Sequence, residues 1–169
     1  LDKLAHEGQI IVVSINYRVG ALGFMPHPSI NEGWNGNLGL EDQRLAMQWV
    51  KDNIESFGGD KNKITLSGES AGAASTCLHV LSKKRVEGLF QQAAPLSYNC
   101  LYEWPTLSSA LTQSNIALSG PQTPIYQRMA QELGCFDSTS PQSAFQLECM
   151  RKKPISEILV AQGKISDVV

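Results

Sequence analysis

Two kinds of apolar pattern alternate along the first half of this chain of 169 residues. Residues 10–16 are nearly all apolar and β-branched, which is typical of a strand buried on both faces of a parallel sheet. Residues 40–56 carry apolar side chains at helical spacing, and we expect this helix to turn four of them toward the sheet, namely Leu45, Trp49, Val50 and Ile54. A second β-rich run follows at residues 63–67. Strand, helix and strand in this order predict a βαβ unit.

The second predicted strand runs into a turn with the sequence Gly68-Glu69-Ser70-Ala71-Gly72, and a helical stretch of small residues follows it. Strand, G-x-S-x-G turn and helix together are typical of a nucleophile elbow. Gly68 and Gly72 would let the strand and helix backbones approach closely around a strained serine. The helix N-terminus would point free N–H groups at the oxygen of Ser70 and at an oxyanion beside it. The alternative is an ordinary Gly/Ser turn.

The second half of the chain is predicted to be mainly helical. We expect a helix over residues 125–133 that Gly134 ends, a helix that Ser140 and Pro141 begin, and a short helix over residues 155–161. The whole pattern predicts an α/β fold with a mostly parallel sheet and flanking helices.

Composition excludes several classes of function. A hydrophobic fraction of 42% and a charged fraction of 18% are typical of a globular protein. A net charge of -2 gives no field that would favour nucleic acid. The sequence has no apolar run long enough for a transmembrane segment. The four cysteines form no C-x-x-C pair, which argues against a zinc site.

The three histidines do not supply a base for Ser70. His79 lies nine residues beyond Ser70 on the predicted helix, about 13 Å along its axis at roughly 1.5 Å per residue. We therefore interpret it as a partly exposed helix residue. His6 and His27 lie earlier in the sequence than the serine.

Several short motifs lie consecutively between residues 10 and 90. They are Asn16-Tyr17-Arg18-Val19-Gly20, Gly23-Phe24, Gly36-Asn37-Leu38-Gly39-Leu40, Asp42-Gln43-Arg44, Trp49-Val50, Phe57-Gly58-Gly59-Asp60 and Gly68-Glu69-Ser70-Ala71-Gly72-Ala73. In this combination the chain resembles the type-B carboxylesterases, the cholinesterase and carboxylesterase group of the α/β-hydrolase fold. The resemblance implies a serine ester hydrolase with a small-molecule ester as substrate and no metal or organic cofactor. It leaves open a homo-oligomer of the parent protein.

The resemblance also implies roles for single residues of the site. Ser70 matches the nucleophile, and the N–H of Ala71 matches one oxyanion-hole donor. Glu69 matches an acidic residue that lines the gorge, although it could also be merely an exposed turn residue. Tyr17 matches a tyrosine near the gorge floor.

Four further residues match structural pairs of the family. Arg44 and Asp60 match an ion pair that holds the helix to the loop before the nucleophile strand, the alternative being two solvated charges. Cys135 and Cys149 match a disulfide, which would add about 3 kcal/mol of stability and favour an extracellular or secretory location. Two buried thiols are the alternative. Cys77 is expected to be a small packed residue.

The chain departs from the family pattern in three respects. The other oxyanion donors are expected upstream of residue 10, and the triad acid and histidine beyond residue 169. We therefore expect residues 1–169 to be a partial carboxylesterase domain that is inactive by itself. Residues 94–109 interrupt the expected run of Ala93 into Ala110 and are interpreted as an insertion or a gene-model artefact, the alternative being a genuine surface excursion. Rival functions are a cholinesterase-like adhesion module without catalysis and a nonfunctional product.

Overall fold

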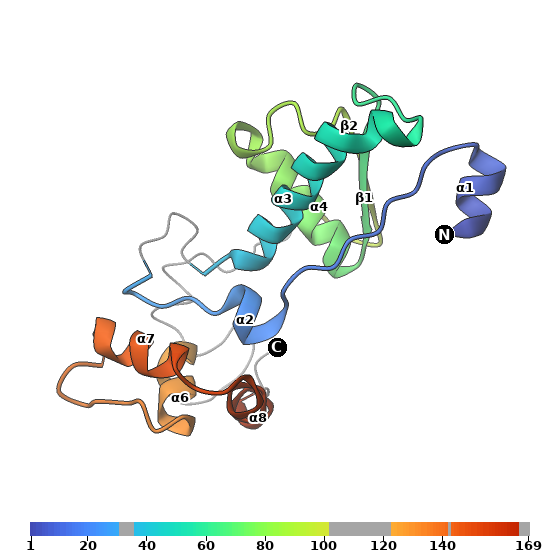
Figure 1. Cartoon of the computed structure of the whole chain (residues 1–169). Helices are drawn as coiled ribbons and strands as arrows, with labels where there is room; N and C mark the ends of the chain where they lie inside the picture. The colour runs from blue at the N-terminus through green and yellow to red at the C-terminus, as the bar shows by residue number, and fades with distance from the viewer. Residues whose placement is uncertain (31–35, 102–122, 142, 166–169) are drawn as a thin grey trace. The chain divides into compact units, whose positions relative to one another are not determined.

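The computed structural model describes residues 1–30, 36–101, 123–141 and 143–165 (Figure 1). The chain divides into two compact units, of which the first comprises Leu1–Tyr17 and Asp42–Tyr102 and the second Arg18–Glu41 and Glu103–Val169. The predicted nucleophile therefore belongs to the first unit, and the cysteines of the predicted disulfide belong to the second.

The first unit holds the parallel sheet. Its elements are α1 (Asp2–Gly8), most of α3 (Leu38–Asn53), the 3-10 turn η1 (Ile54–Phe57), β1 (Thr65–Glu69), α4 (Ala71–Leu81), the 3-10 turn η2 (Lys83–Arg85) and β2 (Gln92–Leu96). β1 and β2 pair in parallel, in register from Thr65 opposite Gln92 to Glu69 opposite Leu96. Helix α4 connects the two strands and contacts both (Figure 1). Because Ala73 and Ala74 are almost fully buried, the helix can lie close to the sheet.

The βαβ unit of the structure is thus β1, α4 and β2, and the strand predicted at residues 10–16 is not formed. Ile10, Ile11, Val13 and Ile15 are between 37% and 50% exposed. A parallel strand needs a neighbour for its N–H and C=O groups. The sheet of the described residues consists of β1 and β2 alone, paired with each other, and this apolar segment forms no ladder with either of them.

Helix α3 buries a different stripe from the one predicted. Met47 and Ile54 are buried, and Met47 packs with Val86 and Leu89 into a small apolar cluster. Leu45 and Trp49 are 61% and 51% exposed, because in the described residues no further strand lies against their face of the helix. The prediction was correct for Ile54 and wrong for Leu45 and Trp49.

The second unit is helical. It contains α2 (Gly20–Phe24), α6 (Ile125–Glu132), α7 (Ala144–Arg151) and α8 (Ile155–Ile165). Its core combines Met129, Leu133, Leu147, Met150 and Ala161. The predicted disulfide between Cys135 and Cys149 is present and links the end of α6 to α7.

The N-terminus of α7 differs from the prediction. Ser143, rather than Ser140, caps this helix, since its hydroxyl accepts a hydrogen bond of 3.2 Å from the N–H of Gln146. A serine at the N-cap satisfies one of the backbone donors that a helix leaves free at its first turn.

Candidate active site

Ser70 joins the end of β1 to the start of α4 in a strained conformation. Its φ of 52° and ψ of -115° lie where non-glycine residues are rarely found. The N–H of Ser70 donates to the carbonyl of Leu96 on β2 at 3.0 Å, and its own carbonyl accepts from the N–H of Ala74 at 3.0 Å. Sheet and helix therefore hold the two backbone groups, and the side chain stands exposed at the tip of the turn.

The close approach of strand and helix depends on Gly68. A Cβ added there would meet the backbone of Gly72, with the Cα of Gly72 2.8 Å away. By contrast, a Cβ added to Gly72 would meet no atom of the described residues within 4 Å. The backbone of Gly72 thus leaves no room for a side chain at Gly68, while at Gly72 the described residues impose no such need.

Ala71 begins helix α4, and its N–H points out of the first helical turn. Among the residues that the structure describes, the N–H groups of Ala71, Gly72 and Ala73 have no hydrogen-bond acceptor. The first intrahelical bond is the one from Ala74 to Ser70. These free donors lie at the positive end of the helix dipole, directly after the serine. The arrangement can stabilise an oxyanion that forms at a carbon bonded to the oxygen of Ser70.

The other two predicted site residues belong to the same unit as Ser70. Glu69 is the last residue of β1 and is exposed beside Ser70. Tyr17 is half-buried, and within the described part of the chain its hydroxyl forms no hydrogen bond with Ser70. Their roles in lining a gorge stay predictions.

Asp60, which the resemblance pairs with Arg44, makes contacts within its own turn. Its carboxylate lies 3.7 Å from the Nζ of Lys63 and accepts the backbone N–H of Asn62 at 2.8 Å. Both partners follow Asp60 in the same turn, and the ion pair with Arg44 stays a prediction. Lys63 is largely exposed, and such a pair stabilises the fold by a fraction of a kcal/mol.

The two buried histidines of the described residues, His27 and His79, each contact a glutamine side chain. His79 is buried, contrary to the prediction, because its Nε2 pairs with the Oε1 of Gln43 at 2.9 Å. His27 is buried in the second unit, where its Nδ1 accepts from the N–H of Ser29 and its Nε2 lies 3.2 Å from the Oε1 of Gln146. Burial lowers the pKa of His27, and the charge of Arg151 lowers it further against the opposing effect of the Gln146 hydrogen bond.

A second disulfide joins Cys77 on α4 to Cys100 beyond β2. The sequence correctly predicts that Cys77 is buried, but it misses the bond. The even number of cysteines was the available signal. The bond attaches the start of the predicted insertion to the helix that carries the site residues. Of residues 94–109, those from 94 to 96 form the second half of β2, and those from 102 onward lie outside the described residues.

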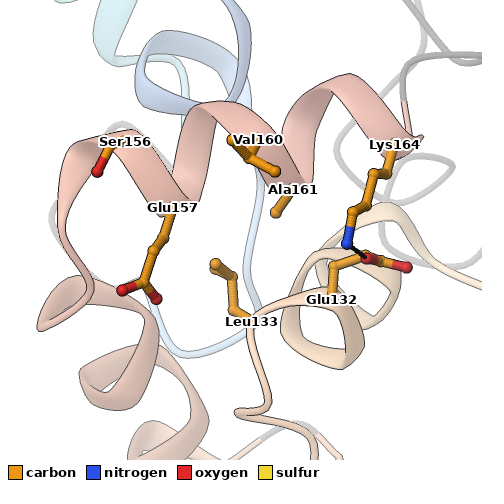
Figure 2. A pocket seen from close by; sticks show the side chains of 7 residues that line it. All are labelled: Glu132, Leu133, Ser156, Glu157, Val160, Ala161 and Lys164. Carbon is orange, nitrogen blue, oxygen red and sulfur yellow. Dashed lines mark ion pairs between the residues drawn. The ribbon is translucent and has the colours of Figure 1, made fainter.

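A pocket lies in the second unit, between α6 and α8 (Figure 2). It has a volume of about 270 Å³ and an apolar floor of Leu133, Val160 and Ala161. An ion pair of 3.0 Å between Lys164 and Glu132 closes one side of it (Figure 2). None of the predicted site residues lines this pocket, so it does not contribute to the candidate active site.

A serine held at positive φ between a parallel strand and a helix, with free N–H groups at its side, defines an α/β-hydrolase. Comparison with known proteins narrows this class: the model of the carboxylesterase family matches residues 1–168. The chain belongs to the carboxylesterase family.

Relatives within the family come from animals and bacteria. The chain is 40% identical to an acetylcholinesterase of Gallus gallus over 162 residues, 96% of this chain and 19% of that protein. It is 39% identical to cholinesterase 1 of Branchiostoma lanceolatum over 165 residues, 98% of this chain and 42% of that protein. A para-nitrobenzyl esterase of Bacillus subtilis (strain 168) is 48% identical over 92 residues, 54% of this chain and 19% of that protein. The chain thus spans about a fifth of the length of the first of these relatives.

Among the described residues, none of the helices combines the length and the apolar character that a membrane crossing requires.

Proposed function

We propose that the protein containing this chain hydrolyses carboxylic esters with Ser70 as the nucleophile. The oxygen of Ser70 attacks the ester carbonyl carbon, and the carbonyl oxygen takes up negative charge as the tetrahedral intermediate forms. The N–H of Ala71 donates to that oxyanion. The histidine base of the parent protein takes the hydroxyl proton of Ser70 and gives it to the alkoxide or phenoxide as the ester C–O bond breaks, which leaves the acyl group on Ser70. Water, deprotonated by the same base, then attacks the acyl-enzyme and releases the carboxylic acid and the Ser70 hydroxyl.

One observation carries this proposal, namely the strained backbone of Ser70. A structure tolerates such a conformation at a non-glycine residue only when its surroundings over-determine it, and such residues gather at active sites. Here β2 and the first turn of α4 hold the two backbone groups of Ser70. The names of the relatives, which are cholinesterases and an esterase, agree with ester chemistry.

The reaction also needs groups that we place in other parts of the parent protein. A histidine base and an acidic residue that orients it follow the serine in this fold. Further oxyanion donors come from a loop before residue 10. We therefore propose that residues 1–169 alone have no esterase activity, since loss of the base removes several orders of magnitude in rate.

The two disulfides support an extracellular or secretory location for the protein. Cys77–Cys100 and Cys135–Cys149 would persist in an oxidising compartment.

We propose general carboxylic esters as the substrate class, because residues 115–121 lack the tryptophan that a cholinesterase-like acyl pocket often has there. No cofactor takes part in the proposed reaction.

Hydrolysis of para-nitrophenyl acetate by the full-length protein tests the proposal. We expect turnover that Ser70→Ala lowers at least about 1,000-fold. The matched control is Ser67→Ala, three residues earlier on the same strand, whose hydroxyl donates to the carbonyl of Ala94. The proposal is wrong if Ser70→Ala keeps the activity, and absence of any turnover in the unaltered protein would favour the adhesion module.

A further inference from the structure

The buried amide of Gln43 connects α3 to the helix that carries the oxyanion donor. Its Nε2 donates to the Oγ of Ser75 at 3.1 Å, and its Oε1 lies 2.9 Å from the Nε2 of His79. Ser75 and His79 are four residues apart and share one face of α4. Gln43 and His79 are each 4% exposed, so the contact between them is buried, whereas the contact of Gln43 with Ser75 is partly buried.

The hydrogen bonds that link these side chains all run in the same direction from donor to acceptor. Because the Nε2 of Gln43 donates to Ser75, its Oε1 is left to accept the N–H at Nε2 of His79. The hydroxyl of Ser75 in turn donates a hydrogen bond of 3.1 Å to the carbonyl oxygen of Ala71. The order is therefore His79 to Gln43 to Ser75 to Ala71, and each bond polarises the next.

The last bond of the chain acts on the oxyanion donor. Two peptide planes meet at the Cα of Ala71. The oxygen of the first, the Ser70 carbonyl, is held by the N–H of Ala74, and the oxygen of the second, the Ala71 carbonyl, is held by Ser75. With both planes held, the N–H of Ala71 has a fixed direction.

We propose that Gln43 is a positioning residue for the ester hydrolase, acting through Ser75 on the N–H of Ala71. This inference rests on the proposed function. Removing the bond lets the first turn of α4 relax, and the donor then meets the oxyanion at a poorer distance and angle. Because the oxyanion forms only in the transition state, the loss falls on kcat rather than on KM.

The rival explanation is that Gln43 merely packs α3 against α4. Gln43→Glu separates the two roles, because glutamate has the same shape and can still accept from His79. It cannot donate to Ser75, so the Ser75 hydroxyl turns to the new carboxylate and leaves the Ala71 carbonyl. Ser75→Ala removes the same final bond without a buried charge, and alanine favours the helix.

The experiment is a double-mutant cycle on the full-length protein with para-nitrophenyl acetate. We expect Gln43→Glu and Ser75→Ala each to lower kcat about tenfold, with KM within about twofold. The kcat of the double variant should fall no further than that of either single variant, because both substitutions break the same series of hydrogen bonds. The matched control is Gln48→Met on the same helix, because the amide of Gln48 donates to the exposed Asp52 in the described residues, and this variant should keep full activity.

Backbone amide exchange in the same variants gives a readout that does not depend on turnover. The N–H groups of Ala74 and Ser75 should exchange faster in Gln43→Glu and Ser75→Ala than in the unaltered protein, while those near Leu81 stay unchanged. An unchanged kcat in Ser75→Ala, or losses that multiply in the double variant, would overturn the inference. If the unaltered protein hydrolyses no ester, the proposed function fails, and unchanged exchange at Ala74 and Ser75 then overturns the inference separately.

Discussion

At the scale of the residue, the two glycines of the elbow have unequal tasks. Gly68 lies where any Cβ would enter the backbone of Gly72, whereas the space around Gly72 itself is open in the described residues. The G-x-S-x-G pattern does not distinguish the two glycines, because their spacing does not reveal at which of them the strand and helix backbones come into contact.

This asymmetry predicts opposite effects of two alanine substitutions. Gly68→Ala should destabilise the protein by about 1–3 kcal/mol, since the new methyl group forces strand and helix apart. Gly72→Ala should be neutral or stabilise by up to about 1 kcal/mol, because alanine is the better helix former. Urea unfolding of the two variants measures the difference, and equal losses would contradict the explanation.

His27 predicts a pH dependence of stability. Its pKa is lowered by burial, and its Nδ1 accepts a hydrogen bond from Ser29 that only the neutral ring can accept. The unfolded chain therefore binds the proton more tightly than the folded protein. The contribution of His27 to stability is complete above the unfolded pKa of about 6.5 and is lost as the pH falls below it toward the lower folded pKa.

Unfolding free energies at pH 7.5 and pH 5.5 check this prediction. The unaltered protein should lose more stability between these values than His27→Gln, which has no proton to bind there. His79 and the carboxylates remain in both proteins, so their titration cancels in the comparison. An equal loss in both proteins would show that the ring of His27 titrates no differently when folded.

At the scale of the element, the sequence predicts what depends on local pattern. The elbow, its helix and the helices near residues 125 and 155 are present. The strand expected at residues 10–16 is absent, because a strand also needs a neighbour that no local pattern supplies. The exposed Trp49 and the bond between Cys77 and Cys100 likewise depend on partners far away in the sequence. The chain of bonds through Gln43 was missed for the same reason.

The disulfide between Cys135 and Cys149 should stabilise the end of α6 against α7. It closes a loop over a sequence separation of 14. Replacing both cysteines with alanine should cost about 3 kcal/mol through the greater freedom of the unfolded chain. Urea unfolding measures this loss. The matched control is the unaltered protein with its disulfides reduced, which should lose at least as much, and a loss below about 0.5 kcal/mol would contradict the prediction.

At the scale of the whole molecule, the family relation supplies what this chain does not show. The proposed reaction takes its nucleophile and one oxyanion donor from this chain, and the two buried histidines of the described residues contact the side chains of Gln43 and Gln146. We expect purified residues 1–169 to hydrolyse para-nitrophenyl acetate no faster than their own Ser70→Ala variant. A rate at least about tenfold above that variant would show that the chain contains its own base.

If Ser70 is an activated nucleophile, a fluorophosphonate probe should modify it covalently. The full-length protein is treated with the probe and digested, and the modified peptide is sequenced by mass spectrometry. We expect a single adduct on Ser70 that is lost in Ser70→Ala and kept in Ser67→Ala. An adduct on another serine, or an unmodified Ser70 in a protein that hydrolyses esters, would contradict it.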